Sequence, residues 1–517
     1  MHARAPLLAL FATFAVGPAA VAAQRTDLGR VDFENSGAPA AQAAFLDGVR
    51  LLHSFEYEDA ATAFRAAQEV DPDFALAYWG EAMTYNHPIW MEQNRDAALE
   101  TLGRLGATPA ERRAKAPTER EKAYLDAIEI LYGEGSKEDR DDRHAEAMRR
   151  LHESYPDDHE AAVFYSLALL GTAHEGRDFT TYMMAASVAQ PVFEANPDHP
   201  GAAHMLIHSF DDPVHAPLGL PAAIAYSRIA PGAAHAQHMT SHIFVARGMW
   251  DDVIRANEVA RDVQNARLAE LGRRDAVCGH FTSWLEYGYL QQGRFDDAAA
   301  VLADCAARID VEPDPGEMGY YGSMMLMYAV DTEDWASVDG FRRDVTGRAA
   351  VALVWLDGYR AVRTGDEAAA REALAAMPRS DDDAARALRM ELEGLIELRW
   401  GSTDDAIAIL TEAADLEASL PYAFGPPGIA LPTREALGDA LLAAGRPADA
   451  LRAYGTQLAR TPRRARALMG LAAAAEAEGD PRRAAEIRAG LSGAWVDTQD
   501  EQHSPMWGRD RLALSRE

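Results

Sequence analysis

A recurring spacing of small and aromatic residues constrains the fold of this 517-residue chain more than any other feature. It is clearest between residues 41 and 74, where five markers fall at positions 8, 20, 24, 27 and 32 of the window: Gly48, Ala60, Phe64, Ala67 and Pro72. Small residues let two antiparallel helices approach closely, an aromatic ring fills the space between them, and proline helps to end the second helix. The segment is therefore predicted to form a helical hairpin that stacks on similar neighbours.

Weaker copies of this unit follow along most of the chain. Their markers are Gly248 with Trp250, Gly293 with Phe295, Gly358 with Ala370, Gly394 with Ala406, and Gly438 with Tyr454 and Pro462. The pattern resembles the tetratricopeptide repeat (TPR), a helical hairpin that recurs at a fixed period. The resemblance implies an all-α fold, a right-handed TPR-type α-solenoid of about nine or ten antiparallel helix pairs. Alternating runs typical of β-strands do not compete with this interpretation.

Interruptions of the repeat divide the chain into segments. The Ala-, Arg- and Pro-containing residues 102–120 are expected to be a long connection, and the Pro- and Gly-rich residues 421–432 a second interruption. The expected segments are a signal peptide (1–23), N-terminal TPR units (24–101), the connection (102–120), central TPR units with a His-rich groove (121–420), the interruption (421–432), C-terminal TPR units (433–494) and a tail (495–517).

The N-terminus has the composition of a secretory signal. An apolar run from Ala5 to Val16 precedes Ala22-Ala23, which suits cleavage before Gln24. The run is short for a bilayer span, and no later stretch of about 20 uncharged apolar residues follows. We expect a periplasmic or secreted protein with no integral membrane segment after signal cleavage.

Net charge argues against one class of partner. The chain carries 81 acidic and 50 basic side chains, a formal charge of −31. Such a surface repels the phosphate backbone, so no nucleic-acid partner is expected.

The histidines are unevenly distributed. Eight of the 16 lie between His174 and His242, and two pairs share one spacing. His204 and His208 are one helical turn apart, His238 and His242 are likewise one turn apart, and one whole repeat length separates the two pairs. An i, i+4 pair places both imidazoles on one face of a helix, and equivalent positions in successive repeats stack side by side. Imidazoles from adjoining helices are therefore predicted to converge on one transition-metal ion, zinc, copper or iron.

The candidate residues fall into groups. The predicted metal ligands are His204, His208, His235, His238 and His242, extended by His174, His215 and Asp212. The predicted ligand groove includes His53, His87 and His280, of which His53 and His87 are also separated by one repeat length. Each such histidine has a plainer interpretation as a hydrogen-bonded packing residue, and the set as a whole as a polar network without metal. Four further histidines in charged or loop contexts are expected at the surface: His144, His152, His159 and His199.

Two short strings extend the resemblance. The segments 238–244 and 86–90 are similar to those of a histidine-rich group of exported bacterial TPR proteins. That resemblance implies a coherent site and no particular reaction.

The two cysteines, Cys278 and Cys305, are expected at adjoining ends of two antiparallel helices. A disulfide is one interpretation in an oxidising compartment, and a pair of buried free thiols is the other.

Three functions remain open at this point. The first is an exported binding protein that holds a transition metal in its concave groove and engages a peptide, protein or small ligand. The second is a metal-dependent hydrolase or oxidoreductase built on the solenoid. The third is a metal-free protein-interaction scaffold, and fold alone does not choose among them.

Overall fold

The computed structural model describes residues 27–343, 348–422, 424–493 and 495. The predicted signal peptide and the tail beyond Trp495 lie outside the described residues.

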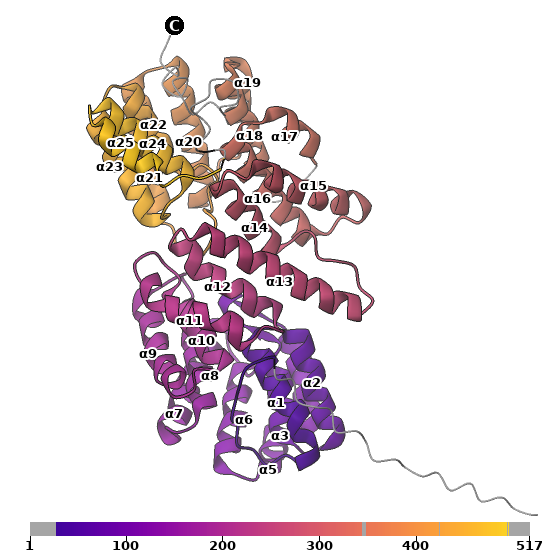
Figure 1. Ribbon diagram of the computed structural model, residues 1–517. Helices are drawn as coiled ribbons and strands as arrows, with labels where there is room; N and C mark the ends of the chain where they lie inside the picture. Colours follow the sequence, from indigo (N-terminus) through magenta and orange to yellow (C-terminus); the bar gives the residue numbers. More distant parts are fainter. Residues whose placement is uncertain (1–26, 344–347, 423, 494, 496–517) are drawn as a thin grey trace, which may run out of the picture.

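Helices make up nearly all of the regular structure in the described residues (Figure 1). The α-helices of the N-terminal half are α1 Gln42–His53, α2 Tyr57–Val70, α3 Ala75–Met83, α4 Arg95–Leu105, α5 Pro109–Lys115, α6 Glu119–Leu131, α7 Lys137–Ser154, α8 His159–Leu170, α9 Phe179–Ala195, α10 Pro200–Phe210, α11 Ala216–Ile229, α12 Ala234–Ala246 and α13 Trp250–Glu270. Those of the C-terminal half are α14 His280–Gln291, α15 Phe295–Val311, α16 Pro315–Thr332, α17 Trp335–Phe341, α18 Arg348–Thr364, α19 Glu367–Ala376, α20 Asp383–Trp400, α21 Thr403–Ser419, α22 Thr433–Ala443, α23 Pro447–Arg460, α24 Ala465–Ala477 and α25 Pro481–Arg488.

Short elements complete the described structure. They are the 3-10 helices η1 Pro39–Ala41 and η2 Pro88–Trp90 and the strands β1 Asn86–His87 and β2 Glu92–Gln93, which pair antiparallel. Together β1, η2 and β2 form a small hairpin between α3 and α4.

The predicted TPR-type α-solenoid is confirmed. Consecutive helices pack against each other and each pair packs on the next, as in α1 with α2, α12 with α13 and α20 with α21. The 25 described helices group into twelve consecutive pairs plus α5, more than the nine or ten expected. Short helices such as α17 and α25 carry too few of the marker residues for the spacing alone to reveal them.

The markers of the first unit perform the role that their spacing predicts. Phe64 of α2 is fully buried, and a Cβ added at Gly48 of α1 would lie 2.8 Å from its ring. A Cβ at Gly80 of α3 would lie 2.3 Å from the same ring, below any normal contact distance. One phenyl ring thus occupies the space left by two glycines, which holds three consecutive helices together.

Turns within the pairs use a left-handed residue. Gly248, Gly293 and Gly445 have φ between 63° and 67°, and each lies two residues after the last residue of its unit's first helix. Phe55 occupies the same place in the first unit with φ 54°. A residue with a Cβ costs roughly 1–2 kcal/mol in this conformation. The first unit therefore carries backbone strain where the other three use glycine.

The expected connection at residues 102–120 is wrong in part. It contains the end of α4, the short helix α5 and the start of α6. Thr108 and Thr118 each form a capping box with the glutamate three residues later, and these two caps start α5 and α6. The described residues between 421 and 432, in contrast, carry no helix.

The solenoid curves until distant units meet. Helix α1 contacts α10, and Asp59 of α2 forms a two-pronged ion pair with Arg267 of α13. In the C-terminal half the buried Arg464 bonds Glu435 and Asp331, which joins α22 to α16. The contacts of α1 with α10 and of α2 with α13 lie around the histidines that were predicted as metal ligands.

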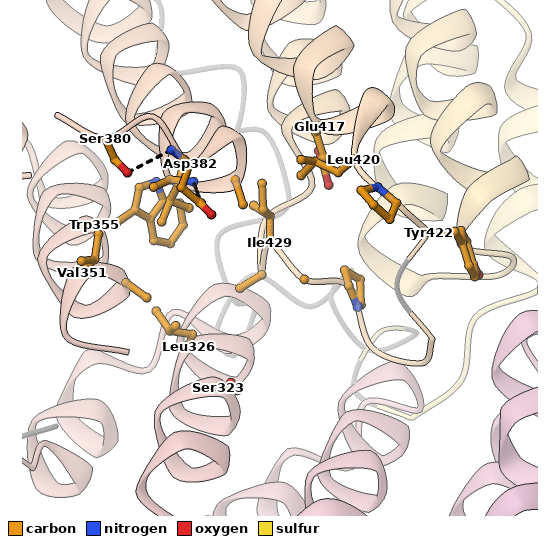
Figure 2. A pocket seen from close by; sticks show the side chains of 18 of the residues that line it. Ser323, Leu326, Val351, Trp355, Ser380, Asp382, Glu417, Leu420, Tyr422 and Ile429 are labelled. Atoms are coloured by element: carbon orange, nitrogen blue, oxygen red, sulfur yellow. Dashed lines mark hydrogen bonds between the residues drawn. The ribbon is translucent and has the colours of Figure 1, made fainter. Parts of the chain in front are cut away.

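Two further features of the described chain bear on function. No described helix combines the length and apolar character needed to cross a membrane. A cavity of about 930 Å³ lies in the C-terminal half, where Trp355, Leu326 and Ile429 line it together with Tyr422 from the interruption (Figure 2).

Candidate metal site

Six histidines from three helices lie in one continuous cluster. They form two groups of three, each with ligand nitrogens within 4.8 Å of one another. The first trio is His204, His208 and His235, and the second trio is His238, His242 and His280. Rings of the two trios also adjoin each other, with centroids 5.9 Å apart for His208–His242 and 6.0 Å apart for His235–His238. The six histidines thus divide into two sets of three, whereas the sequence analysis expected them to converge on one ion.

The repeat architecture brings these side chains together. Helix α10 supplies His204 and His208, and α12 supplies His235, His238 and His242. Both are first helices of their units, so residues one repeat apart in sequence occupy neighbouring places in space. His280, at the start of α14, adds the next unit. It was predicted as a groove residue, and the structure places it in the second trio.

Three of the six rings are oriented by a partner on Nδ1. Nδ1 of His204 lies 2.6 Å from the backbone carbonyl of His53, and Nδ1 of His242 lies 2.5 Å from Asp211 Oδ2. Nδ1 of His238 lies 2.7 Å from Oδ1 of Asn257, whose amide nitrogen donates to a backbone carbonyl of its own helix. All three partners are acceptors, so each Nδ1 carries the hydrogen. The Nε2 lone pairs of the three rings then point into the cluster, the tautomer that ligates a metal.

The second trio contains a contact that neutral rings do not favour. Nε2 of His238 and Nε2 of His242 are 3.2 Å apart, and the Nδ1 partners leave a lone pair on both atoms. Two lone pairs at this distance repel unless a proton or a cation lies between them. Burial, reinforced by His280, holds the pKa of His238 well below its usual range, which disfavours the proton.

The first trio contains buried nitrogens without protein partners. Nε2 of His204, Nε2 of His235 and both ring nitrogens of His208 have no hydrogen-bond partner among the described residues. His208 is 2 % exposed, so water does not readily replace the missing bonds. A buried polar atom without a partner costs roughly 1–3 kcal/mol. Four such atoms in one place indicate an arrangement made for something other than packing.

Burial also lowers the pKa values of four further rings in the cluster. It lowers the pKa of His204 to about 3, against the bond to the His53 carbonyl, and lowers the pKa of His280 to about 3. The pKa values of His208 and His235 also lie well below the usual range, mainly through burial. Neutral imidazole is the form that binds transition metals.

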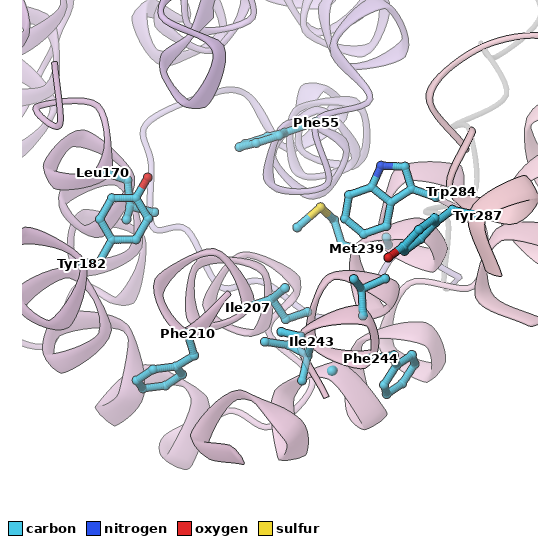
Figure 3. Close-up of a cluster of buried hydrophobic side chains, with 14 of the residues drawn as sticks. Phe55, Leu170, Tyr182, Ile207, Phe210, Met239, Ile243, Phe244, Trp284 and Tyr287 are labelled. Carbon is cyan, nitrogen blue, oxygen red and sulfur yellow. The ribbon is translucent and has the colours of Figure 1, made fainter. Parts of the chain in front are cut away.

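Aromatic side chains enclose the two trios. The ring of Phe55 lies 4.3 Å from that of His204, and the ring of Trp284 lies 4.3 Å from that of His242. Figure 3 shows Phe55 and Trp284 above α10 and α12, with Phe210 and Ile243 on the opposite side. The strained turn at Phe55 thus places an apolar wall on the first trio, which keeps bulk water out.

The two trios differ in exposure. His280 of the second trio is partly exposed, whereas Nε2 of His235 in the first trio is buried. Trp90 of η2 lies 6.0 Å from His235 and is 44 % exposed, and Tyr320 lies 5.9 Å from His280 and is 37 % exposed. The hairpin of β1, η2 and β2 therefore lies beside the first trio.

A third cluster, in which Glu160 bonds two histidines, lies next to the first trio. Glu160 of α8 lies between two imidazoles, with Oε2 2.5 Å from Nε2 of His53 and Oε1 3.1 Å from Nε2 of His199. Burial opposes ionisation of Glu160, yet the two imidazoles outweigh it and hold its pKa below the usual range. Since the carbonyl of His53 fixes the ring of His204, this cluster positions the first trio rather than competing with it.

Other predicted ligands lie outside the trios. His174 is paired with Asp142 at 2.9 Å, because it belongs to the loop before α9 rather than to a groove helix. His215 is paired with Asp212 at 2.8 Å, and Asp212 is also paired with the buried Arg177. These three residues satisfy one another or neighbours, so the prediction of metal ligation is not supported for them.

The remaining histidines correct further expectations. His87 was predicted in the groove; it lies in β1 of the hairpin and stacks on Tyr57 with ring centroids 4.0 Å apart. His144 and His199 were expected at the surface, and both are buried. His199 caps α10 by accepting the amide hydrogen of Ala202, a role that the Pro200 following it signals.

Several supporting residues escaped the sequence analysis. Asn257 and Glu160 were not singled out, because each acts across a helix interface that one sequence does not reveal. The cysteines lie as their positions suggested: the structure pairs Cys278 with Cys305, with Cα atoms 4.7 Å apart. That disulfide fixes the segment directly before His280 to α15.

Comparisons with known proteins extend only to general shape. No family model matches the chain, and no curated protein matches it. Solved structures similar to it include a human IFIT1 dimer with m7Gppp-AAAA, 13 % identical over 91 % of this chain and 92 % of that one, with a TM-score of 0.35. Another is Cut9 in the APC/C hetero-tetramer Cut9–Hcn1, 13 % identical over 94 % and 78 %, with a TM-score of 0.33. The TPR domain of P58(IPK) is 14 % identical over 92 % and 98 %, with a TM-score of 0.20.

Proposed function

We propose that this TPR-type scaffold is an exported binding protein that holds a transition metal in its six-histidine cluster. The observation that carries the proposal is the 3.2 Å contact between Nε2 of His238 and Nε2 of His242. When both rings are neutral, both nitrogens present lone pairs, since Asn257 and Asp211 accept from the opposite ring nitrogens. A divalent cation between them turns this repulsion into two bonds of about 2.0–2.1 Å.

The all-nitrogen donor set narrows the metal. Imidazole suits zinc, copper, iron and nickel, whereas calcium and magnesium prefer oxygen. The outer bonds to Asp211, Asn257 and the His53 carbonyl resemble those that orient ligating histidines generally. Of these four metals, the proposal is zinc, copper or iron.

A metal-free scaffold is the plainer alternative. In that case the four unpartnered nitrogens of the first trio would impose a cost without return. A purely structural polar cluster normally resembles Glu160 with His53 and His199, in which the carboxylate bonds both rings. The contrast between the two clusters favours metal binding at the trios.

A metal-dependent enzyme is the second candidate. Three nitrogens around an ion leave a coordination position open, as catalytic zinc sites do. Neither trio includes a carboxylate, however, and Asp211 already accepts the hydrogen of His242. A binding role therefore ranks above hydrolase or oxidoreductase activity.

The partner of the scaffold is proposed to be a peptide, protein or small ligand. The cavity of about 930 Å³ is of the size that small-molecule sites have, and Trp355, Leu326 and Ile429 give it apolar walls (Figure 2). A fluorescent apolar dye should bind this cavity, and Ala352→Trp should weaken that binding by filling it. Unchanged dye affinity in the variant would remove the cavity from the account.

Metal content tests the proposed function. Protein purified from its native compartment should contain at least one transition-metal ion per chain by elemental analysis. The double variant His204→Gln with His238→Gln should lose most of it, and His215→Gln should keep it, since His215 lies outside the trios. If the wild type carries no metal and neither zinc nor copper raises its melting temperature, the metal-free scaffold is correct.

A further inference from the structure

The two trios are complete three-nitrogen sets that lie side by side. Each has ligand atoms within 4.8 Å of one another, a spread that one ion can draw together with small ring movements. Between the trios, His208 adjoins His242 and His235 adjoins His238, with ring centroids 5.9 Å and 6.0 Å apart. Six rings around one ion would have to abandon this pairing, because the members of each trio lie closer to one another.

We propose that the cluster holds two transition-metal ions, one in each trio, joined by a small exogenous bridging anion such as hydroxide or azide. The inference rests on the proposed metal-binding function. It adds the number of ions, their assignment to the two trios and the anion that bridges them. The first ion is bound by His204, His208 and His235. The second ion is bound by His238, His242 and His280.

Charge accounts for the bridging ligand. Two divalent ions in adjacent trios repel each other strongly in a buried site, and imidazole ligands bring no negative charge. Among the described residues, one carboxylate is bonded directly to a ring of the trios. It is Asp211, which accepts from His242. Glu160 acts on the first trio only through His53. One carboxylate against four positive charges leaves an excess, and an anion bound to both ions reduces it most effectively because it lies between them.

The coordination number of the two ions also favours a bridging anion. Three nitrogens leave each ion at least one open position. His280 is the partly exposed member of the second trio, whereas the ligand atoms of the first trio are buried, so a small molecule would approach the pair of ions from the side of His280. Tyr320 packs beside His280, Trp90 beside His235, and the rings of Phe55 and Trp284 pack on His204 and His242. A bridging ligand among these packed rings must therefore be small.

Stoichiometry is the first test. Metal-free protein is titrated with zinc, and bound metal is measured by elemental analysis after dialysis. Wild type should bind two ions per chain, whereas His235→Gln and His280→Gln should each bind one. His152→Gln is the matched control, because it changes a partly buried histidine outside both trios and should still bind two. Circular dichroism confirms that each variant folds.

The outcomes separate this inference from the proposed function. One ion in the wild type, lost in both variants, would overturn the two-ion arrangement and leave the metal-binding function standing. No bound ion in the wild type would overturn both. Two ions in the wild type and in both trio variants would place the metal elsewhere and overturn both as well.

Adjacency and the bridge need a separate measurement. Loaded with copper(II), the wild type should give an electron paramagnetic resonance signal weakened by coupling between the two ions, with less than about half of the intensity expected for isolated ions. His235→Gln should give the full signal of one isolated ion. Azide should change the wild-type spectrum at one equivalent per ion pair. Two full, uncoupled copper signals, or azide bound at two equivalents, would overturn the shared bridge.

Discussion

Replacing His208 by leucine separates a metal ligand from a packing residue. Both ring nitrogens of His208 are buried without partners, each at a cost of roughly 1–3 kcal/mol. Leucine has a similar volume and no polar atom, so His208→Leu should stabilise the metal-free protein by about 2 kcal/mol after small packing losses. The same change should remove the stabilisation that the first trio's ion provides, about 2.7 kcal/mol at 100 times its dissociation constant.

Urea unfolding with chelator and with excess zinc measures both effects. His144→Leu is the matched control, because His144 is equally buried but lies 3.0 Å from the carbonyl of Ala127 through Nδ1. Loss of that bond should destabilise the control by about 1–2 kcal/mol and leave its zinc response intact. If His208→Leu destabilises the metal-free protein as His144→Leu does, His208 is a structural residue and the reasoning is wrong.

Three further predictions concern the outer bonds, the helix packing and pH. Asp211→Asn should weaken metal binding about 10- to 100-fold by calorimetric titration, since it removes the charge that orients one ligating ring. Gly80→Ala should destabilise by about 1–3 kcal/mol in urea, because its Cβ would overlap Phe64; Gly103→Ala, with open space around its Cβ, should be neutral or stabilising. Burial lowers the pKa of His144 from 6.5 to about 4, against its bond to Ala127. As the pH is lowered, His144 therefore gains a proton in the unfolded chain before it does so in the folded chain. Its contribution to the free energy of unfolding should fall by about 3 kcal/mol between pH 6.5 and 4. His144→Leu should lose that part of the pH dependence in urea unfolding.

The repeat pattern predicted the fold because its markers act locally. Gly48, Phe64 and Gly80 touch within one unit and the next, so their spacing in sequence reports directly on a contact in space. The repeat pattern did not reveal helices whose starts are fixed by capping residues rather than by the repeat markers. Thr108 and Thr118 cap two helices in a segment whose composition resembled a loop.

The candidate site was predictable as far as the repeat period reaches. A separation of one repeat length placed His208 beside His242 on neighbouring helices. His204 instead adjoins His235. The division into two trios was not predictable, because it depends on ring directions. Those directions come from Asp211, Asn257 and the closure of the first unit onto α10, which lie outside the period.

X-ray absorption at the metal edge of the loaded protein tests the central claim most directly. The account predicts a first shell dominated by imidazole nitrogen at about 2.0–2.1 Å, with the outer-shell scattering that rigid imidazole rings produce. A first shell containing sulfur, or one of oxygen without imidazole scattering, would contradict it.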